Sequence, residues 1–293
     1  MRRSLGIAAM ALTVGLSACA SVRPQTAAGT PPPGAQYLYG SGEAAALEEQ
    51  AFNVLVLHAR QWVASEKARP GPRVSAILTP DATLDQPVTL PCRADQPRAV
   101  LFDMDETLVA NLGYEYGDAH HDHAFDDASW ARFEKTGEAS VVAMPGAENA
   151  LFLLRNLGLT IVVNTNRNAA SADVTARTLA GLGLGTFRHG DTLFLKGDVD
   201  GKGAKDGRRA AIAARYCVIA QVGDQLGDFT DRFTGSAPER RAATQLAATR
   251  GLFGTFWFVM PNSAYGTGLA GSWSDVFPTD KRWIDPATKK DRN

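Results

Sequence analysis

The stretch RAVLFDMDETLVAN, residues 98–111, decides how the rest of the sequence is interpreted. Its first half is an apolar run typical of a short buried strand. The run ends at Asp103, and two more acids, Asp105 and Glu106, follow within three residues. Clustered carboxylates at the end of a buried strand need either a turn to cap or a cation to join them. Taken alone, the stretch leaves both explanations open.

The composition bounds the class of protein. The chain has 293 residues, of which 45% are hydrophobic, enough for one sizeable core or two modest ones. Its 30 basic and 31 acidic residues give a formal net charge of −1. A nucleic-acid polymer is therefore not an expected partner, because proteins that bind one usually carry a basic surface.

The N-terminus carries a targeting signal. Residues 1–18 have two early arginines, an apolar stretch and then small residues, which predicts a secretory signal peptide. Its end, LSAC at residues 16–19, is similar to a bacterial lipobox, in which cleavage leaves a lipidated cysteine, here Cys19. An ordinary signal peptide with an incidental cysteine is the alternative. Because Ala20 follows, we expect an exported lipoprotein of the outer membrane or cell surface, facing the periplasm or the exterior.

A tether and a helix are expected next. Residues 19–42 are rich in Pro, Gly, Ala and Thr and lack apolar periodicity, which is typical of a linker. Residues 41–68 begin with a serine and carry an apolar helical stripe. Pro70 and Pro72 would end this helix, and we expect a proline-containing loop up to residue 97.

Apolar strands then alternate with helical patterns. We expect strands at 99–103, 159–167, 191–197, 217–225 and 254–262, and helices at 145–158, 171–183 and 205–216. This alternation predicts an α/β fold with a Rossmann-like parallel sheet and helices on both faces. Sheets of this kind bind ligands beyond the carboxyl ends of their strands.

Polar residues gather at those carboxyl ends. They are Asp103, Asp105, Thr165, Asn166, Lys205, Asp224 and Asp228. Clustered carboxylates repel one another unless a cation joins them, and a site with few carboxylates suits Mg²⁺. Mg²⁺ beside a hydroxyl, an amide and a lysine suits a phosphoryl group, and an aspartate can then attack phosphorus.

Four ordered motifs carry a family resemblance. They read DMDET (103–107), TNR (165–167), KGAKDGR (202–208) and VGDQLGDF (222–229). The chain resembles haloacid-dehalogenase-like phosphatases and, within them, the class C acid phosphatases, the bacterial surface-lipoprotein 5′-nucleotidase group. The resemblance spans roughly residues 41 to 275. One departure is Gln225, where the family has asparagine, and we expect it to change the surroundings of the metal only modestly.

The resemblance implies a role for each acid. Asp103 would be the nucleophile, and Asp105 the general acid and then the base. The metal ligands would be the carboxylates of Asp103 and Asp224 and the backbone carbonyl of Asp105. Asp228 would orient a metal-bound water or complete the site.

The resemblance also implies a phosphate site. Thr165, Asn166 and Lys205 would hold the phosphoryl oxygens, with Lys202 as the competitor of Lys205. Arg208 would pair with an acid of the site, unless it is an ordinary surface residue of its helix.

The family likeness further predicts a phosphatase domain over 43–293 with a small helical cap, formed from about 43–70 and 108–144. Caps close active sites and set specificity. Tyr114 and Tyr116 are the candidates for stacking on a nucleobase or a phenyl ring.

Two cysteines remain besides the lipobox cysteine. In the sheet order of the family, the strands that follow Cys92 and Cys217 are neighbours. We therefore hypothesise a disulfide at the edge of the sheet away from the chemistry, which an oxidising compartment would allow. Two free thiols are the alternative, because Cys92 lies some residues upstream of its strand.

The predicted protein is a lipid-anchored, magnesium-dependent acid phosphatase. It would hydrolyse small phosphomonoesters, such as 5′-nucleotides and aromatic phosphates, through an aspartyl-phosphate. A phosphotransferase with the same intermediate and a non-catalytic surface lipoprotein are the alternatives. A homodimer is left open, and HHDH at residues 120–123 fits either a metal site or a solvated turn. The tail from 280 to 293 is expected to be loosely ordered.

Overall fold

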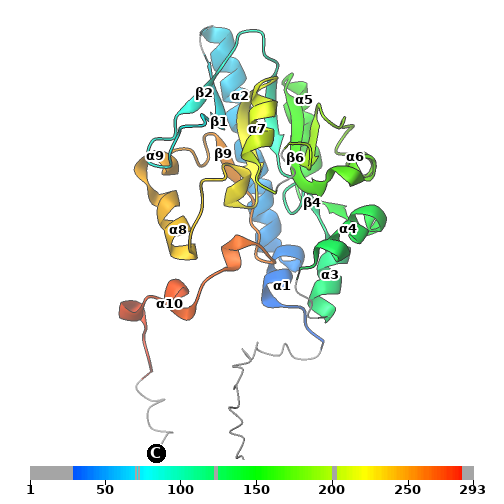
Figure 1. Ribbon diagram of the computed structural model, residues 1–293, viewed down its shortest axis with the longest axis vertical. Coiled ribbons are helices and arrows are strands. Elements are labelled where there is room, and N and C mark those ends of the chain that lie inside the picture. The colour runs from blue at the N-terminus through cyan, green and yellow to red at the C-terminus, as the bar shows by residue number, and fades with distance from the viewer. Residues whose placement is uncertain (1–28, 70, 72, 122–124, 200–202, 286–293) are drawn as a thin grey trace, which may run out of the picture.

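A five-stranded parallel sheet lies at the centre of the protein (Figure 1), in the order β7-β6-β3-β8-β9. The computed structural model describes residues 29–69, 71, 73–121, 125–199 and 203–285. The strands are β3 Arg98–Phe102, β6 Thr160–Asn168, β7 Leu193–Lys196, β8 Cys217–Gly223 and β9 Trp257–Val259. The predicted α/β fold with a parallel sheet is confirmed.

Alternate residues of β3 face two different cores. Val100 and Phe102 belong to the larger core, together with helices α2 (Gly42–Ala68), α5 (Ala147–Asn156) and α6 (Ala172–Gly181). Ala99 and Leu101 belong to a second core with β1 (Arg73–Leu78) and α7 (Asp206–Ala213). Both faces of the strand are therefore buried, which explains why its sequence is continuously apolar.

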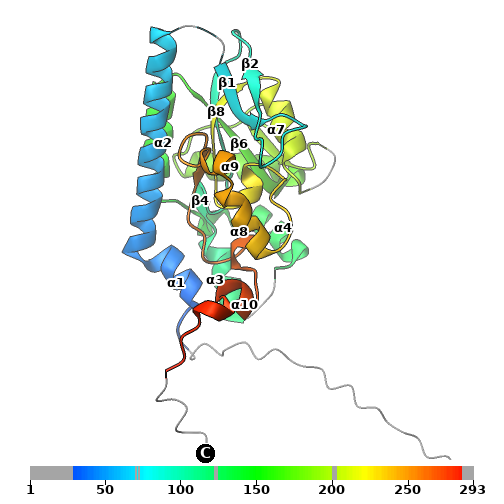
Figure 2. The same cartoon turned by 90° about the vertical axis from the view of Figure 1, so that its left-hand side faces the viewer.

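Helix α2 runs along one side of the molecule (Figure 2). Its first turn is capped by Ser41, whose hydroxyl accepts a hydrogen bond of 3.0 Å from the backbone N–H of Ala44. Phe52, Leu55 and other buried residues of this helix pack into the larger core. The segment expected to contribute to the cap thus covers a face of the sheet instead.

Two segments expected to lack regular structure have it. Helix α1 (Pro33–Gly40) lies inside the predicted tether. It has a proline in its first turn, where the backbone N–H that proline lacks would have no partner within the helix. Strands β1 and β2 (Thr89–Cys92) pair antiparallel inside the predicted loop. Proline is tolerated there because β2 is paired on one side only.

The cap is built between β3 and β6 along the chain. It consists of α3 (Leu112–His121), α4 (Asp127–Thr136) and an antiparallel ribbon of β4 (Val109–Ala110) and β5 (Val142–Ala143). Glu134 of α4 is buried and accepts hydrogen bonds from the backbone and side chain of Asn168 at 2.9 and 3.0 Å. These bonds fix α4 to the end of β6.

Further short helices complete the chain. They are α8 (Ala237–Gln245), α9 (Ala247–Arg250), α10 (Trp273–Val276) and the 3₁₀ turns Glu138–Ser140, Ala169–Ser171, Leu226–Asp228, Thr267–Leu269 and Thr279–Lys281. The segment around α10 leaves the body of the protein on the side of α1 (Figure 1). Residues 280–285 are exposed, apart from partly covered Asp285, and the rest of the predicted loose tail lies outside the described residues.

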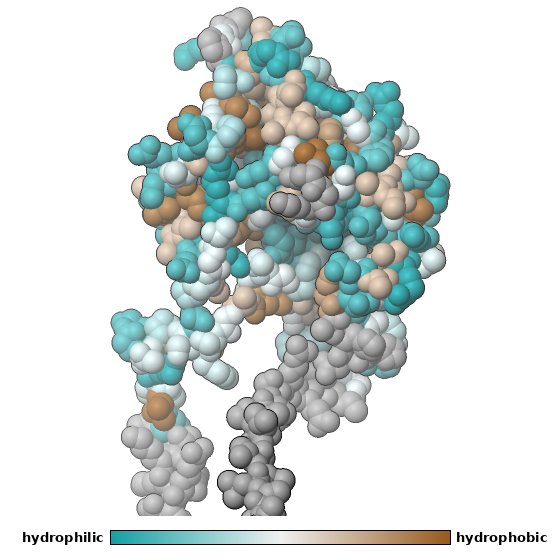
Figure 3. Space-filling model, viewed as in Figure 1, coloured by the Kyte–Doolittle hydropathy of each residue, from teal (hydrophilic) through white to brown (hydrophobic). Residues whose placement is uncertain are grey.

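The surface mixes polar and apolar residues. On the face seen in Figure 3, hydrophobic residues are scattered among hydrophilic ones. In the described ranges, no helix has both the length and the apolar character that crossing a membrane requires.

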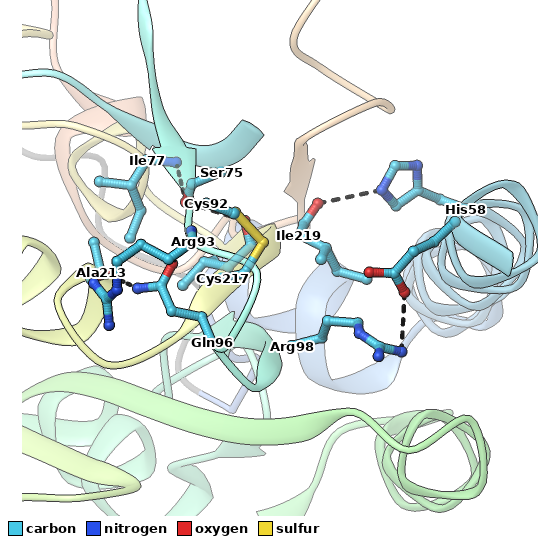
Figure 4. Close-up of a disulfide and its surroundings, with 12 residues drawn as sticks. His58, Ser75, Ile77, Cys92, Arg93, Gln96, Arg98, Ala213, Cys217 and Ile219 are labelled. Atoms are coloured by element: carbon cyan, nitrogen blue, oxygen red, sulfur yellow. Dashed lines mark hydrogen bonds and ion pairs between the residues drawn. A yellow bond between two sulfur atoms is a disulfide. The ribbon is translucent and has the colours of Figure 1, made fainter. Parts of the chain in front are cut away.

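Cys92 and Cys217 form a disulfide, with Cα atoms 5.2 Å apart (Figure 4). The bond ties the end of β2 to the start of β8, and Cys217 pairs in register with Arg98 at the start of β3. Arg98 also forms an ion pair of 3.0 Å with Glu66 of α2. The hypothesis of a disulfide at the edge of the sheet away from the carboxyl ends of the strands is confirmed.

Candidate active site

Three carboxylates meet at the carboxyl-terminal edge of the sheet. Asp103 follows β3, Asp224 follows β8, and Asp228 ends the short 3₁₀ turn after β8. One oxygen of each lies within 4.8 Å of the others. The sheet therefore brings together acids that are more than a hundred residues apart in sequence, as predicted.

Lys205 joins two of these acids. Its Nζ lies 2.7 Å from Oδ1 of Asp228 and forms a second ion pair with Asp103. The lysine stands at the N-terminus of α7, where its backbone N–H donates to Asp231 at 2.9 Å. Burial raises the pKa of Asp103 well above its usual value, Lys205 opposes the rise, and the neighbouring acids add to it.

Asp224 is the second acid with a shifted pKa. Burial first, and Asp228 next, raise the pKa of Asp224 to about 7. Its Oδ2 accepts hydrogen bonds from Gln225 at 2.7 Å and from Asn262 at 2.8 Å. Gln225 also accepts from the backbone of Thr267 at 3.1 Å, so the unusual glutamine is held on both sides.

The three acids fit a divalent cation. Their mutual repulsion and burial disfavour the ionised state, and a bound cation would reverse that preference. Hard divalent ions take such carboxylate oxygens. Asp228, predicted to support the metal site, has its carboxylate in the cluster itself and is a candidate ligand beside Asp103 and Asp224.

Asp105 is held by Thr165 and by two side chains without a predicted role, Arg167 and Asn111. Arg167 donates to its Oδ1 from Nε at 2.9 Å, and the two side chains form an ion pair in which Nη2 lies 2.8 Å from the same oxygen. Asn111 donates to the same oxygen at 3.0 Å, and the hydroxyl of Thr165 donates to Oδ2 at 3.2 Å. Arg167 stood in the quoted TNR motif, and an arginine inside a buried strand pattern was the available signal.

Glu106, left without a role by the sequence, is the centre of a buried network. It is 0% exposed and has φ +53°, a left-handed conformation in the turn after Asp105. It accepts hydrogen bonds from the backbone of Asn111 at 2.9 Å, from Tyr39 at 3.2 Å and from Tyr265. Burial first, and Asp105 next, raise its pKa to about 8. Glu106 thus joins three segments next to Asp105.

Only two of the three residues predicted to bind phosphate reach the cavity. Asn166 and Lys205 line the cavity described below, whereas Thr165 is fully buried behind it. The prediction that Arg208 pairs with an acid is wrong. Arg208 is buried and donates instead to the backbone oxygen of Thr165 and the side-chain oxygen of Asn166. Carbonyl oxygens also accept hydrogen bonds from arginine, so Arg208 supports the carboxyl-terminal part of β6.

A cavity of about 1170 Å³ opens above these residues. The acids and Lys205 line its floor, Tyr114 and Trp130 line its cap side, and residues 32–35 line a third side. Of the two stacking candidates, Tyr114 lines the cavity and lies edge-on to Trp130, with ring centroids 4.9 Å apart. Tyr116 is not among the lining residues, is 66% exposed and stacks on His120. Residues 122–123 of the HHDH stretch lie outside the described residues.

The arrangement has a counterpart in a known family. The family model described as HAD superfamily, subfamily IIIB (Acid phosphatase) matches residues 79–268, which include all four motifs. The chain belongs to this family. The fold resembles the class C acid phosphatase from Bacillus anthracis with tungstate bound, with a TM-score of 0.63 and 19% identity over 88% of this chain and 92% of that one.

Two further relatives agree with this assignment. Another structure of the Bacillus anthracis class C acid phosphatase gives a TM-score of 0.62 at 20% identity, with the same coverage of 88% and 92%. Acid phosphatase 1 of Solanum lycopersicum is 29% identical over 136 residues. That match spans 44% of this chain and half the length of the tomato protein. The predicted membership of the HAD-superfamily acid phosphatases is confirmed, and the fold is similar to that of class C acid phosphatases.

Proposed function

We propose that this HAD-family protein is a magnesium-dependent phosphomonoesterase that works through an aspartyl-phosphate on Asp103. The observation that carries the proposal is the meeting of Asp103, Asp224 and Asp228 around Lys205 on the floor of a large cavity. Mg²⁺ held by these carboxylates and the backbone carbonyl of Asp105 would neutralise charge on the phosphoryl group.

The protein's residues then act in two steps. In the first, the Asp103 carboxylate attacks phosphorus, the bond from phosphorus to the leaving oxygen breaks, and Asp105 gives its proton to that oxygen. In the second, Asp105 takes a proton from water as the water attacks phosphorus, and phosphate leaves Asp103. Arg167 and Asn111 orient the Asp105 carboxyl group for both transfers.

Substrates would be small phosphate esters with a flat leaving group. Asn166 and Lys205 would hold the phosphoryl oxygens, and Tyr114 offers a ring on the cap side of the same cavity. We include 5′-nucleotides and aromatic phosphates in this class.

We further propose an exported lipoprotein anchored at Cys19, on the outer membrane or the cell surface. The signal peptide and lipobox support this location, and a disulfide between Cys92 and Cys217 suits an oxidising compartment. Expression with a radiolabelled fatty acid tests the anchor. The label should enter the wild type and be lost in Cys19→Ser, and an equally labelled variant contradicts it.

Metal removal tests the enzymatic proposal. Protein treated with EDTA should lose hydrolysis of p-nitrophenyl phosphate and recover it with Mg²⁺, while its far-ultraviolet circular dichroism stays unchanged. Activity that survives EDTA overturns the metal-dependent mechanism. Adding an alcohol acceptor distinguishes a phosphotransferase, for which transfer would exceed hydrolysis. If the wild type has no activity at any metal concentration, the alternative of a non-catalytic surface lipoprotein is favoured.

A further inference from the structure

Helix α1 forms one side of the active-site cavity, although it lies outside the part of the chain that the family model matches. The matched range begins at residue 79, and α1 covers Pro33–Gly40. Residues 32–35 line the cavity together with Asp103 and Lys205 on its floor. In the two views of Figures 1 and 2, α1 lies at the foot of α2 and beside α3 of the cap.

Gly34 brings α1 into direct contact with the loop after β9. A Cβ at this position would lie 1.9 Å from the backbone oxygen of Ser263, a separation that atoms cannot adopt. The hydroxyl of Ser263 donates to the backbone oxygen of Gly34 at 2.7 Å. The contact therefore requires glycine, and any side chain must push α1 away from the loop.

Tyr39 fixes the other end of α1. Its hydroxyl donates to Glu106 at 3.2 Å, and Tyr265 of the loop after β9 donates to the same carboxylate. The ring of Tyr39 also packs against the larger core. Two separate contacts thus hold α1 at a fixed distance from the turn that carries Asp105.

Two parts of the cavity lining differ in chemistry. Residues 32–35 read PPGA and offer no charge and no polar side chain. Tyr114 and Trp130 face the same cavity from the cap. A phosphate group bound at Lys205 would have its leaving group in a cavity lined by this apolar segment and by aromatic rings, which suits a flat apolar ring.

We propose that α1 is a specificity-determining wall of the active site, which binds the flat apolar leaving group of the substrate and is held in place by Gly34 and Tyr39. The inference rests on the proposed function for the place of the phosphoryl group. It predicts that displacing α1 weakens binding of the leaving group and leaves binding of phosphate alone unchanged.

The test compares two ligands on the full-length protein with Mg²⁺ by titration calorimetry. One is 1-naphthylphosphonate, which reaches the wall and cannot be hydrolysed, and the other is inorganic phosphate. In Gly34→Ala we expect the Kd of the phosphonate to rise about tenfold and that of phosphate to change less than about twofold. Gly40→Ala is the matched control on the same helix, because a Cβ there meets nothing within 4 Å.

Tyr39→Phe is the second variant, and it keeps the ring while removing the bond to Glu106. We expect a rise of about threefold in the phosphonate Kd, with Tyr37→Phe unchanged because Tyr37 is exposed. The proposal that α1 is a specificity-determining wall is overturned if both ligands bind equally more weakly, or if a folded Gly34→Ala variant binds the phosphonate as tightly as the wild type. A wild type that binds the phosphonate more tightly than phosphate without hydrolysing p-nitrophenyl phosphate contradicts the proposed function alone. A wild type that binds neither ligand overturns both.

Discussion

At the carboxyl-terminal edge of the sheet, two buried carboxylates and the half-buried Asp224 lie within 4.8 Å of one another, whereas at the amino-terminal edge β2 and β8 are joined by a covalent bond. Near the second edge lie a partly exposed ion pair between Arg98 and Glu66 and a hydrogen bond between His58 and the backbone oxygen of Ile219 (Figure 4). The first edge carries buried charge, and the second carries almost none.

The difference separates function from stability. Buried acids that repel one another destabilise the fold, and the pKa of Asp224 near 7 reflects that cost. The disulfide ties β2 to the start of β8, the strand whose other end leads to Asp224, and it stabilises the fold chiefly by restricting the unfolded chain. Substitutions at the two edges should therefore affect different measurements.

The largest expected effect is on activity, from Asp103→Asn. An amide cannot form the aspartyl-phosphate, so we expect kcat for p-nitrophenyl phosphate to fall at least about 1000-fold. The melting temperature should stay close to that of the wild type, because one acid of a repelling set is removed and Lys205 keeps Asp228. Asp95→Asn, at the other edge and 79% exposed in its side chain, is the control and should change neither quantity. Activity retained in Asp103→Asn contradicts the mechanism.

The next effect is on stability, from the double variant Cys92→Ala/Cys217→Ala. The bond closes a loop with a sequence separation of 125 residues, for which chain entropy predicts a loss of about 5 kcal/mol in the free energy of unfolding. Urea denaturation measures the loss, and kcat should remain within about twofold of the wild type. Reduction of the wild type by dithiothreitol should lower its unfolding midpoint in the same way. Unchanged midpoints would mean that the bond does not secure this edge.

A smaller effect on activity is expected from Arg167→Lys. Lysine keeps the charge near Asp105 but loses the planar group that donates to Asp105 from Nε and to Asn111 from Nη2. We expect kcat to fall about 10- to 100-fold, because the proton donor is oriented less well. Arg177→Lys on the exposed surface of α6 is the matched control. If both variants keep the wild-type kcat, Arg167 does not position Asp105.

The smallest effect is the pH dependence contributed by His58 at the disulfide edge. Burial lowers the pKa of His58 in the folded protein from its ordinary 6.5. The unfolded chain therefore binds the proton first, so this contribution to stability is present above about pH 6.5 and is lost as the pH falls from there through the lower pKa of the folded protein. Melting temperatures from pH 8 to pH 5 should decline less steeply in His58→Asn than in the wild type. Parallel curves would exclude His58 as the cause.

The sequence predicted the five strands of the parallel sheet and the acids near their ends, because each strand is a local apolar run and the acids follow it within a few residues. Partners of those acids, such as Asn111 and Tyr39, could not be predicted, since they depend on which distant segments fold side by side. Helix α1 and the β1–β2 pair were missed because both segments contain several prolines, a composition typical of linkers and loops. Their prolines occupy the first turn of a helix and a strand paired on one side, two places that tolerate this residue.

The disulfide has a consequence for proteolysis. Cys92 and Cys217 enclose Asp103, the whole cap and Lys205 within one covalent ring. A protease that cuts one peptide bond inside this ring leaves two fragments that remain linked through sulfur. A nicked molecule would run at full length on a non-reducing gel and separate only after reduction, and its two central strands would keep their pairing although the backbone between them is broken.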